Sequence, residues 1–329
     1  MKENLRMSRT QEQINHHVVA NYAGVDVGKN TLDFAIHALD CHLAVPNDER
    51  GIQKLIRQCV LHNVELVVLE PTGKFHRLLH QQLHDADIPV AVVNPFRSRQ
   101  FADSLGQLAK TDKIDARVLA RYGAVINPPA TEPISDTGKE LQELQTARRQ
   151  LVDEIGNLKR RLKACDHDVV QKQIRARLKL AQSHKTAIEE ALLAVILPDP
   201  ELSSKFKILT SIPNIGATTA VLLLAELSEL GHVNCRQIAA LAGVAPMNWD
   251  SGSRTGTRAT RGGRPHIRKA LYMCAVSGIN RRSAYGTMYK KLIQKGKPPK
   301  VALTAITRKL VVLANTLITE KRRSEPRLP

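Results

Sequence analysis

The chain has 329 residues, which is enough for two or three domains with hydrophobic cores of their own. Lysine and arginine outnumber aspartate and glutamate by 49 to 31, a formal charge of +18, so the first partner to expect is a polyanion bound through its phosphates. No apolar run approaches the ~20 residues of a membrane-spanning helix, and residues 1–17 lack the apolar core of a signal peptide. The five cysteines are scattered without a C-x-x-C pair, which argues against disulfides or a zinc site and for a reducing cytoplasm. Only 3% of the residues are aromatic, so stacking on bases is not the expected main mode of nucleic-acid binding.

The first third of the chain predicts a mixed sheet covered by helices. Three short strands joined by tight turns come first, and alternating helices and strands follow. The expected strands are Tyr22–Gly28, Leu32–Ala38, His42–Val45, Leu66–Leu69 and Val90–Val93, and the expected helices are Glu49–Leu61, Phe75–Leu83 and Phe96–Leu105. The order β-β-β-α-β-α-β-α is that of a ribonuclease H-like α/β fold.

An aspartate interrupts the first of these strands. Val25 and Val27 alternate with Gly24, Asp26 and Gly28, the period of a strand with one apolar face, although aspartate is depleted in strands. The flanking glycines leave room for something to approach the backbone, and a carboxylate suits a hard cation. The plainer interpretation is a strand-end aspartate that turns the chain.

Three further carboxylates are expected near Asp26. Glu70 follows the buried strand Leu66–Leu69, at the carboxyl end where open α/β sheets place ligands. Asp112 and Asp115 are three residues apart, so in a helix they share a face. Taken singly, Glu70 fits a turn residue, and Asp112 with Asp115 fits a helix cap with a capping carboxylate. Taken together, clustered carboxylates repel one another unless a divalent cation such as Mg²⁺ neutralises them.

The segment Gly24–Gly28 also looks like the first phosphate loop of actin-like ATPases and sugar kinases. Those proteins need a second Asp-x-Gly hairpin and a glycine pair for adenosine, and the sequence has neither. A Walker P-loop does not fit either, because the Gly24–Gly28 spacing is one residue short and Asn30 replaces Ser or Thr.

The middle of the chain predicts long helices. Pro128, Pro129 and Pro133 separate it from the first third, and apolar residues then recur at heptad-like spacing from Leu141 onward. The phase slips at residues 166–168, which indicates two helices or one helix with a stutter. Arg148 and Lys185 occupy core positions there. Both a helix pair packed within its own chain and an intermolecular coiled coil fit this pattern.

The last third combines apolar helices with a basic loop. Residues 212–216 resemble the hairpin of helix-hairpin-helix modules, although Asn214 replaces the usual glycine and an ordinary helix start fits equally well. Helices are expected from there to Leu230, and over residues 267–282 and 299–320. Between them, Gly, Ser and Thr alternate with cations in a composition typical of a loop that closes on phosphate. The expected nucleic-acid-binding residues are Arg254, Arg258, Arg261, Arg264, Arg268 and Lys269.

The same loop contains a candidate nucleophile. Ser251 precedes Gly252, and a serine that attacks a phosphodiester needs a group to take its proton and positive charge to stabilise the phosphate. The arginines supply the charge, but no histidine lies near in sequence to take the proton. On spacing alone Ser253 is nearly as good a candidate, and a hydrogen-bonding role is the plainer interpretation of both.

Five motifs occur in an order that resembles a known family. They are Gly-Val-Asp26-Val-Gly-Lys, Val-Leu-Glu70-Pro-Thr-Gly, Lys-Thr-Asp112-Lys-Ile-Asp115-Ala, Ile-Pro-Asn-Ile-Gly216 and Ala-Pro-x-x-x-x-Ser251-Gly. The chain is similar, from about Tyr22 to Arg282, to the DEDD transposases of insertion sequences of the IS110/IS1111 type, which are bridge-RNA-guided serine recombinases.

The resemblance implies a division of labour within the chain. A RuvC-like domain is expected over residues 20–127, a helical coiled coil over 137–197 and a C-terminal transposase domain over 203–320. Asp26, Glu70, Asp112 and Asp115 would hold Mg²⁺, and Ser251 would form a covalent phosphoserine link to DNA.

The resemblance also implies partners. Donor and target DNA would both pair with a structured guide RNA, and the acids and the serine would come from different subunits of a dimer of dimers. Such a protein would act at the bacterial nucleoid. The alternative enzyme is a RuvC-like nuclease in which a metal-activated water attacks and Ser251 only contacts DNA. A non-catalytic nucleic-acid scaffold is the remaining alternative.

Overall fold

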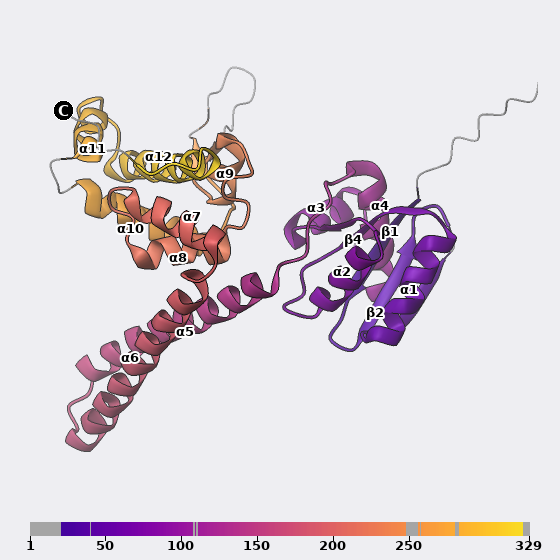
Figure 1. The fold of residues 1–329 in the computed structure, drawn as a ribbon, viewed down its shortest axis with the longest axis horizontal. Coiled ribbons are helices and arrows are strands. Elements are labelled where there is room, and N and C mark those ends of the chain that lie inside the picture. Colours follow the sequence, from indigo (N-terminus) through magenta and orange to yellow (C-terminus); the bar gives the residue numbers. More distant parts are fainter. Residues whose placement is uncertain are drawn as a thin grey trace, which may run out of the picture. The chain divides into compact units, whose positions relative to one another are not determined.

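The computed structural model describes residues 21–39, 41–107, 109, 111–247, 256, 258–279 and 283–324. The chain forms two compact units that divide between Ile134 and Ser135 (Figure 1). The division falls in the proline-containing segment predicted to be a boundary. The finer division into three domains stays a prediction.

The first unit is built on the predicted mixed sheet. Its strands are β1 (Asn21–Val27), β2 (Thr31–Ile36), β3 (His42–Pro46), β4 (Val64–Leu69) and β5 (Val90–Val92). The spatial order is β3-β2-β1-β4-β5, with the first three strands antiparallel and β4 and β5 parallel to β1. This mixed sheet with helices on it is compatible with the expected ribonuclease H-like fold.

Helices cover both faces of this sheet (Figure 1). They are α1 (Glu49–Leu61), α2 (His76–Asp85), α3 (Pro95–Ser104) and α4 (Asp112–Ile126). Val67 and Leu69 of β4 pack with α1 and α2, while the alternate residues Leu66 and Val68 pack with α4. The uninterrupted apolar run of β4 is explained by this burial on both faces.

Helix α4 packs closely against the backbone of Gly24 in β1. A Cβ atom on Gly24 would fall on the carbonyl oxygen of Ala116 and the backbone nitrogen of Ala120, closer than real Cβ contacts come. The glycine therefore sets the distance between β1, which carries Asp26, and the helix that begins with Asp112.

We expect Gly24→Ala to lower the free energy of unfolding by about 2–3 kcal/mol, because backbone atoms of α4 have to move to admit the methyl group. The matched control is Gly156→Ala in the middle of helix α5 (Asp136–Lys163), where a Cβ atom meets nothing within 4 Å. That change should stabilise by about 0.5–1 kcal/mol. Urea denaturation of both variants checks the pair, and equal stabilities would contradict direct packing of α4 on β1.

The second unit begins with two long helices that pack against each other, α5 and α6 (Asp168–Ile196). Helical structure stops between Lys163 and Asp168, where the hydrophobic pattern slips, so this segment forms two helices. Arg148 and Lys185, predicted at core positions, both contact Glu189: Arg148 Nη2 lies 2.7 Å and Lys185 Nζ 2.6 Å from its carboxylate oxygens. These bonds lower the pKa of Glu189 despite its partial burial. The pair packs within its own chain, and a coiled coil between chains stays a prediction.

Six further helices share a core. They are α7 (Pro200–Ser211), α8 (Ala217–Glu226), α9 (Cys235–Leu241), α10 (Pro265–Ile279), α11 (Ala284–Gln294) and α12 (Pro299–Thr319). Helix α12 is long and apolar enough to cross a membrane by length and composition, so the sequence-based statement that no run approaches this length was wrong. However, Ile306, Leu310 and Ala314 of α12 are completely buried within this core, as expected for the central helix of a globular domain.

Candidate functional site

In the first unit, the charges of the other three predicted acids act on Asp26. Asp26 lies on β1, Glu70 immediately follows β4, and Asp112 and Asp115 lie in the first turn of α4. The pKa of Asp26 is raised to about 6, first by burial and then by the charges of Asp115, Asp112 and Glu70. All of the charged groups that shift it are carboxylates, so their negative charge reinforces rather than cancels.

The start of helix α4 excludes the plainer interpretation of its acids. Thr111, not Asp112, is the N-cap, and its hydroxyl accepts a hydrogen bond from the backbone N–H of Ile114. The predicted alternative, with Asp112 as the cap, is therefore wrong. Because the cap is already supplied, Asp112 and Asp115 are left without that structural task, although the helix N-terminus favours their negative charge.

Two further residues belong to this site and were not predicted from the sequence. Asp33 of β2 pairs directly with Asp26 of β1, and its charge also raises the pKa of Asp26. It lies 3.0 Å from Nε2 of His42 on β3. The other residue is the buried Ser98 of α3, whose hydroxyl donates to Oε1 of Glu70 at 2.5 Å and so orients that carboxylate. The register of the first hairpin indicates Asp33, whereas no spacing in the sequence indicates Ser98.

Carboxylate oxygens are the donor set that Mg²⁺ prefers. Among the described residues, however, no three His, Cys, Asp or Glu side chains meet closely enough to hold a metal ion as they stand. The residue types fit a hard cation, but the side chains must draw closer together to ligate it.

The second unit contains the serine loop, which we define as residues 248–257 between strands β6 (Pro246–Met247) and β7 (Ala259–Thr260). Ser251, Ser253 and Arg254 lie outside the residues that the structure describes. The ends of the loop are nevertheless held together, because β6 and β7 pair antiparallel. We call this pair of strands, with the residues that flank it, the neck of the loop.

Two of the predicted nucleic-acid-binding arginines hold this neck. Arg268 donates from Nη1 to the carbonyl oxygens of Gly262, at 2.8 Å, and Gly243, at 3.3 Å. Arg264 forms a bidentate pair with Glu229, with N···O distances of 2.7 and 2.8 Å, and this pair lowers the pKa of Glu229 against the effect of burial. Both guanidinium groups are therefore engaged within the protein.

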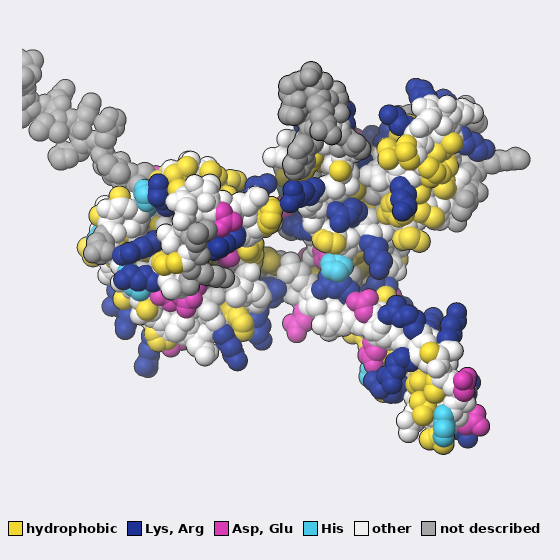
Figure 2. Space-filling model, turned by 180° about the vertical axis from the view of Figure 1, so that it is seen from behind, with side chains coloured by type: hydrophobic (Ala, Val, Ile, Leu, Met, Phe, Trp, Pro, Cys, Tyr) yellow, Lys and Arg dark blue, Asp and Glu magenta, His cyan; other side chains and the backbone are white. Residues whose placement is uncertain are grey.

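The remaining predicted cations are exposed around the neck. Arg258 and Arg261 flank β7, and Lys269 lies on α10; all three have exposed side chains. Lys269 also lines a hollow of about 490 Å³ with Lys300, Tyr272 and Thr260. Dark blue Lys and Arg side chains are spread over the drawn surfaces of both units, and magenta acids are fewer (Figure 2).

The helix-hairpin-helix resemblance receives support from the backbone. Asn214, between α7 and α8, has a φ of 73°, the left-handed conformation for which glycine is usual and which asparagine tolerates. The residue that weakened the resemblance in sequence therefore adopts the backbone of the expected glycine.

Two family models match successive parts of the chain. Residues 23–165 match the IS110-type DEDD family described as "Transposase", and residues 206–290 match "Transposase IS116/IS110/IS902 family". A "Pilin gene-inverting protein" of Moraxella bovis is 30% identical over 93% of this chain and 98% of its own length. The chain belongs to the IS110 family of DEDD transposases. The "Pilin gene-inverting protein" of Moraxella lacunata matches this chain at the same identity and coverage.

A further IS110-family relative covers a smaller part of the chain. "Insertion element IS110 uncharacterized 43.6 kDa protein" of Streptomyces coelicolor is 27% identical over 49% of the chain and 40% of its own length. As a member of this family the protein is a transposase or recombinase that acts on DNA. The actin-like ATPase is therefore not supported.

Proposed function

We propose that this transposase exchanges DNA strands through a covalent phosphoserine intermediate, with Mg²⁺ held by Asp26, Glu70, Asp112 and Asp115. The role of the four acids is supported by the raised pKa of Asp26. The charges of the other three predicted acids contribute to this rise. A charge cluster of this kind is destabilising unless it serves to bind a cation. When bound, Mg²⁺ would supply positive charge at the phosphate that reacts.

The chain's own groups have distinct tasks in this scheme. Ser98 fixes the orientation of Glu70 through its short hydrogen bond, and Asp33 holds further negative charge beside Asp26. The hydroxyl of Ser251 would form a new P–O bond while a bridging P–O bond of DNA breaks, and the leaving oxygen takes up a proton. The number of phosphodiester-type bonds is conserved, so no external energy is required.

The exposed cations beside the neck would bring DNA to the serine loop. Arg258 and Arg261 flank β7, where the chain leaves this loop, and Lys269 lines a hollow together with Thr260 of β7. Cations there compensate the charge of approaching phosphates. Following the family resemblance, we also propose that a structured guide RNA pairs with donor and target DNA. The acids and the serine would come from different chains of a dimer of dimers in the cytoplasm.

The test is to incubate purified protein, copurifying RNA, DNA containing the element ends, and Mg²⁺, and then to denature the mixture. We expect DNA to remain covalently attached to protein, and the attachment to disappear when EDTA replaces Mg²⁺. Cleaved DNA without any attached protein would instead support a nuclease that uses water. Recombination that continues unchanged in EDTA would contradict the role of the acid cluster.

A further inference from the structure

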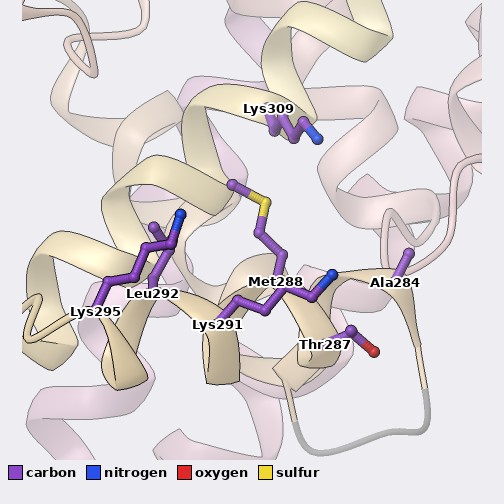
Figure 3. Close-up of a pocket in the computed structure, with 7 residues that line it drawn as sticks. All are labelled: Ala284, Thr287, Met288, Lys291, Leu292, Lys295 and Lys309. Carbon is purple, nitrogen blue, oxygen red and sulfur yellow. The ribbon is translucent and has the colours of Figure 1, made fainter.

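A second cation-lined pocket lies in the C-terminal helices. It has a volume of about 420 Å³ and opens between α11 and α12 (Figure 3). We call it the lysine pocket. Its lining residues are Ala284, Thr287, Met288, Lys291, Leu292, Lys295 and Lys309.

One face of α11 forms most of this pocket. The lining residues from Ala284 to Lys295 recur at helical spacings of three and four, and Lys309 reaches toward them from α12 (Figure 3). Met288 and Leu292 supply apolar surface, Thr287 a hydroxyl and the three lysines positive charge. The pocket therefore combines apolar contact with several hydrogen-bond donors for an anion.

The lysine pocket lies in a segment of the chain that is rich in positive charge. Residues 283–319 contain seven Lys or Arg residues and no Asp or Glu. In the described part of the chain, none of the ion pairs includes Lys291, Lys295 or Lys309. The position of Lys291 in the last turn of α11 favours its charge through the helix dipole. Lys309 has no such explanation, because it lies in the middle of α12.

We propose that the lysine pocket binds a backbone phosphate of duplex DNA. Ammonium groups and a hydroxyl suit phosphate oxygens, while Met288 and Leu292 suit the apolar side of the adjoining sugar. The scarcity of aromatic residues favours a duplex over a stacked single strand. The inference rests on the action of the protein on DNA and adds an anchoring contact to the proposed function.

The test compares two variants with the same loss of charge. Lys291→Gln with Lys309→Gln removes two lysines from the pocket. Lys290→Gln with Lys297→Gln removes two exposed neighbours that do not line it. Duplex affinity is measured without Mg²⁺ at several salt concentrations, on two duplexes of unrelated sequence. Thermal melting confirms that both variants fold.

We expect the pocket variant to bind both duplexes about tenfold more weakly and to lower the slope of log affinity against log salt by about 1. The control variant should change the affinity less than threefold. Equal weakening by the two variants would overturn the proposal, since it would show only the effect of net charge. So would a loss of affinity for single-stranded RNA with duplex binding unchanged.

The outcome is separable from that of the catalytic proposal. Duplex affinity is measured without Mg²⁺, so this readout does not depend on whether the acid cluster of the first unit binds a metal ion. Failure of the acid cluster to affect cleavage would thus leave the lysine pocket intact. Weak binding by the pocket variant together with normal cleavage at saturating protein would support an anchoring role.

Discussion

Asp26→Asn should abolish DNA strand cleavage, with a loss of at least about 10³-fold in the cleavage rate. The physical reason is that Asp26 is a half-buried member of the acid cluster proposed to hold Mg²⁺, and a catalytic metal ion contributes several kcal/mol to a phosphoryl transfer. Cleavage is measured as product formed per unit time at saturating Mg²⁺. The matched control is Asp85→Asn at the end of α2, which replaces an acid that does not affect the pKa of Asp26.

The same variant should be more stable than the wild type in the absence of Mg²⁺. Since the folded pKa of Asp26 is about 6 and its ordinary value is 3.8, the folded chain binds more protons between these pH values. Its stability therefore falls as pH rises from about 4 to about 6. Asparagine does not ionise, so the variant lacks this loss of stability. At pH 8 the melting temperature of Asp26→Asn should be about 2–4 °C above that of the wild type, after allowing for solvent screening of a half-buried group.

With Mg²⁺ present, the wild type should become more stable than the Asp26→Asn variant. Cation binding requires the ionised carboxylate, so Mg²⁺ should raise the melting temperature of the wild type at pH 8 and much less at pH 4.5. The Asp26→Asn protein should gain little at either pH. A wild type that is insensitive to Mg²⁺, or a variant that gains equally, would show that the acids are not a cation site.

The sheet was predictable because its pattern is local. Alternation in β1 and β2, the tight turn between them and the apolar run of β4 each follow from a few neighbouring residues. The helix predicted from Glu49 to about Leu61 is α1. The prediction extended β2 to Ala38, where the structure turns with a φ of 64°. Helices α7 and α11 were not predicted, although Asp199 and Ser283 cap them with their side chains. In the sequence, these two cap residues alone did not indicate helix starts, because prolines and basic residues surround them.

The acid cluster was predictable from element ends, whereas its supporting contacts were not. Glu70 and Asp112 lie at a strand end and a helix start, and topology brings such ends together. The bond between Ser98 and Glu70 depends on how α3 packs, which spacing does not encode. For Arg264 and Arg268, the basic composition predicted phosphate binding. In the structure both guanidinium groups instead form hydrogen bonds within the protein, beside the neck of the serine loop.

Ser251→Ala should eliminate the covalent DNA–protein product while leaving DNA binding unchanged. Without the hydroxyl no phosphoserine bond can form, so the expected loss is complete for the adduct and about 10⁴-fold or more for recombination. The adduct is measured by denaturing electrophoresis of labelled DNA, and binding by titration without Mg²⁺. Ser251→Cys keeps a nucleophile at the position and should retain a trace of adduct.

Ser253→Ala is the matched control, because the two serines are two residues apart in the same loop and spacing alone does not separate them. Its adduct should form at a rate within about tenfold of wild type, since a hydrogen bond contributes only about 1 kcal/mol. Loss of the adduct in Ser253→Ala with its retention in Ser251→Ala would move the nucleophile to Ser253. Cleavage at the normal rate by the double variant would assign the attack to water, and the acid cluster alone would then carry the chemistry.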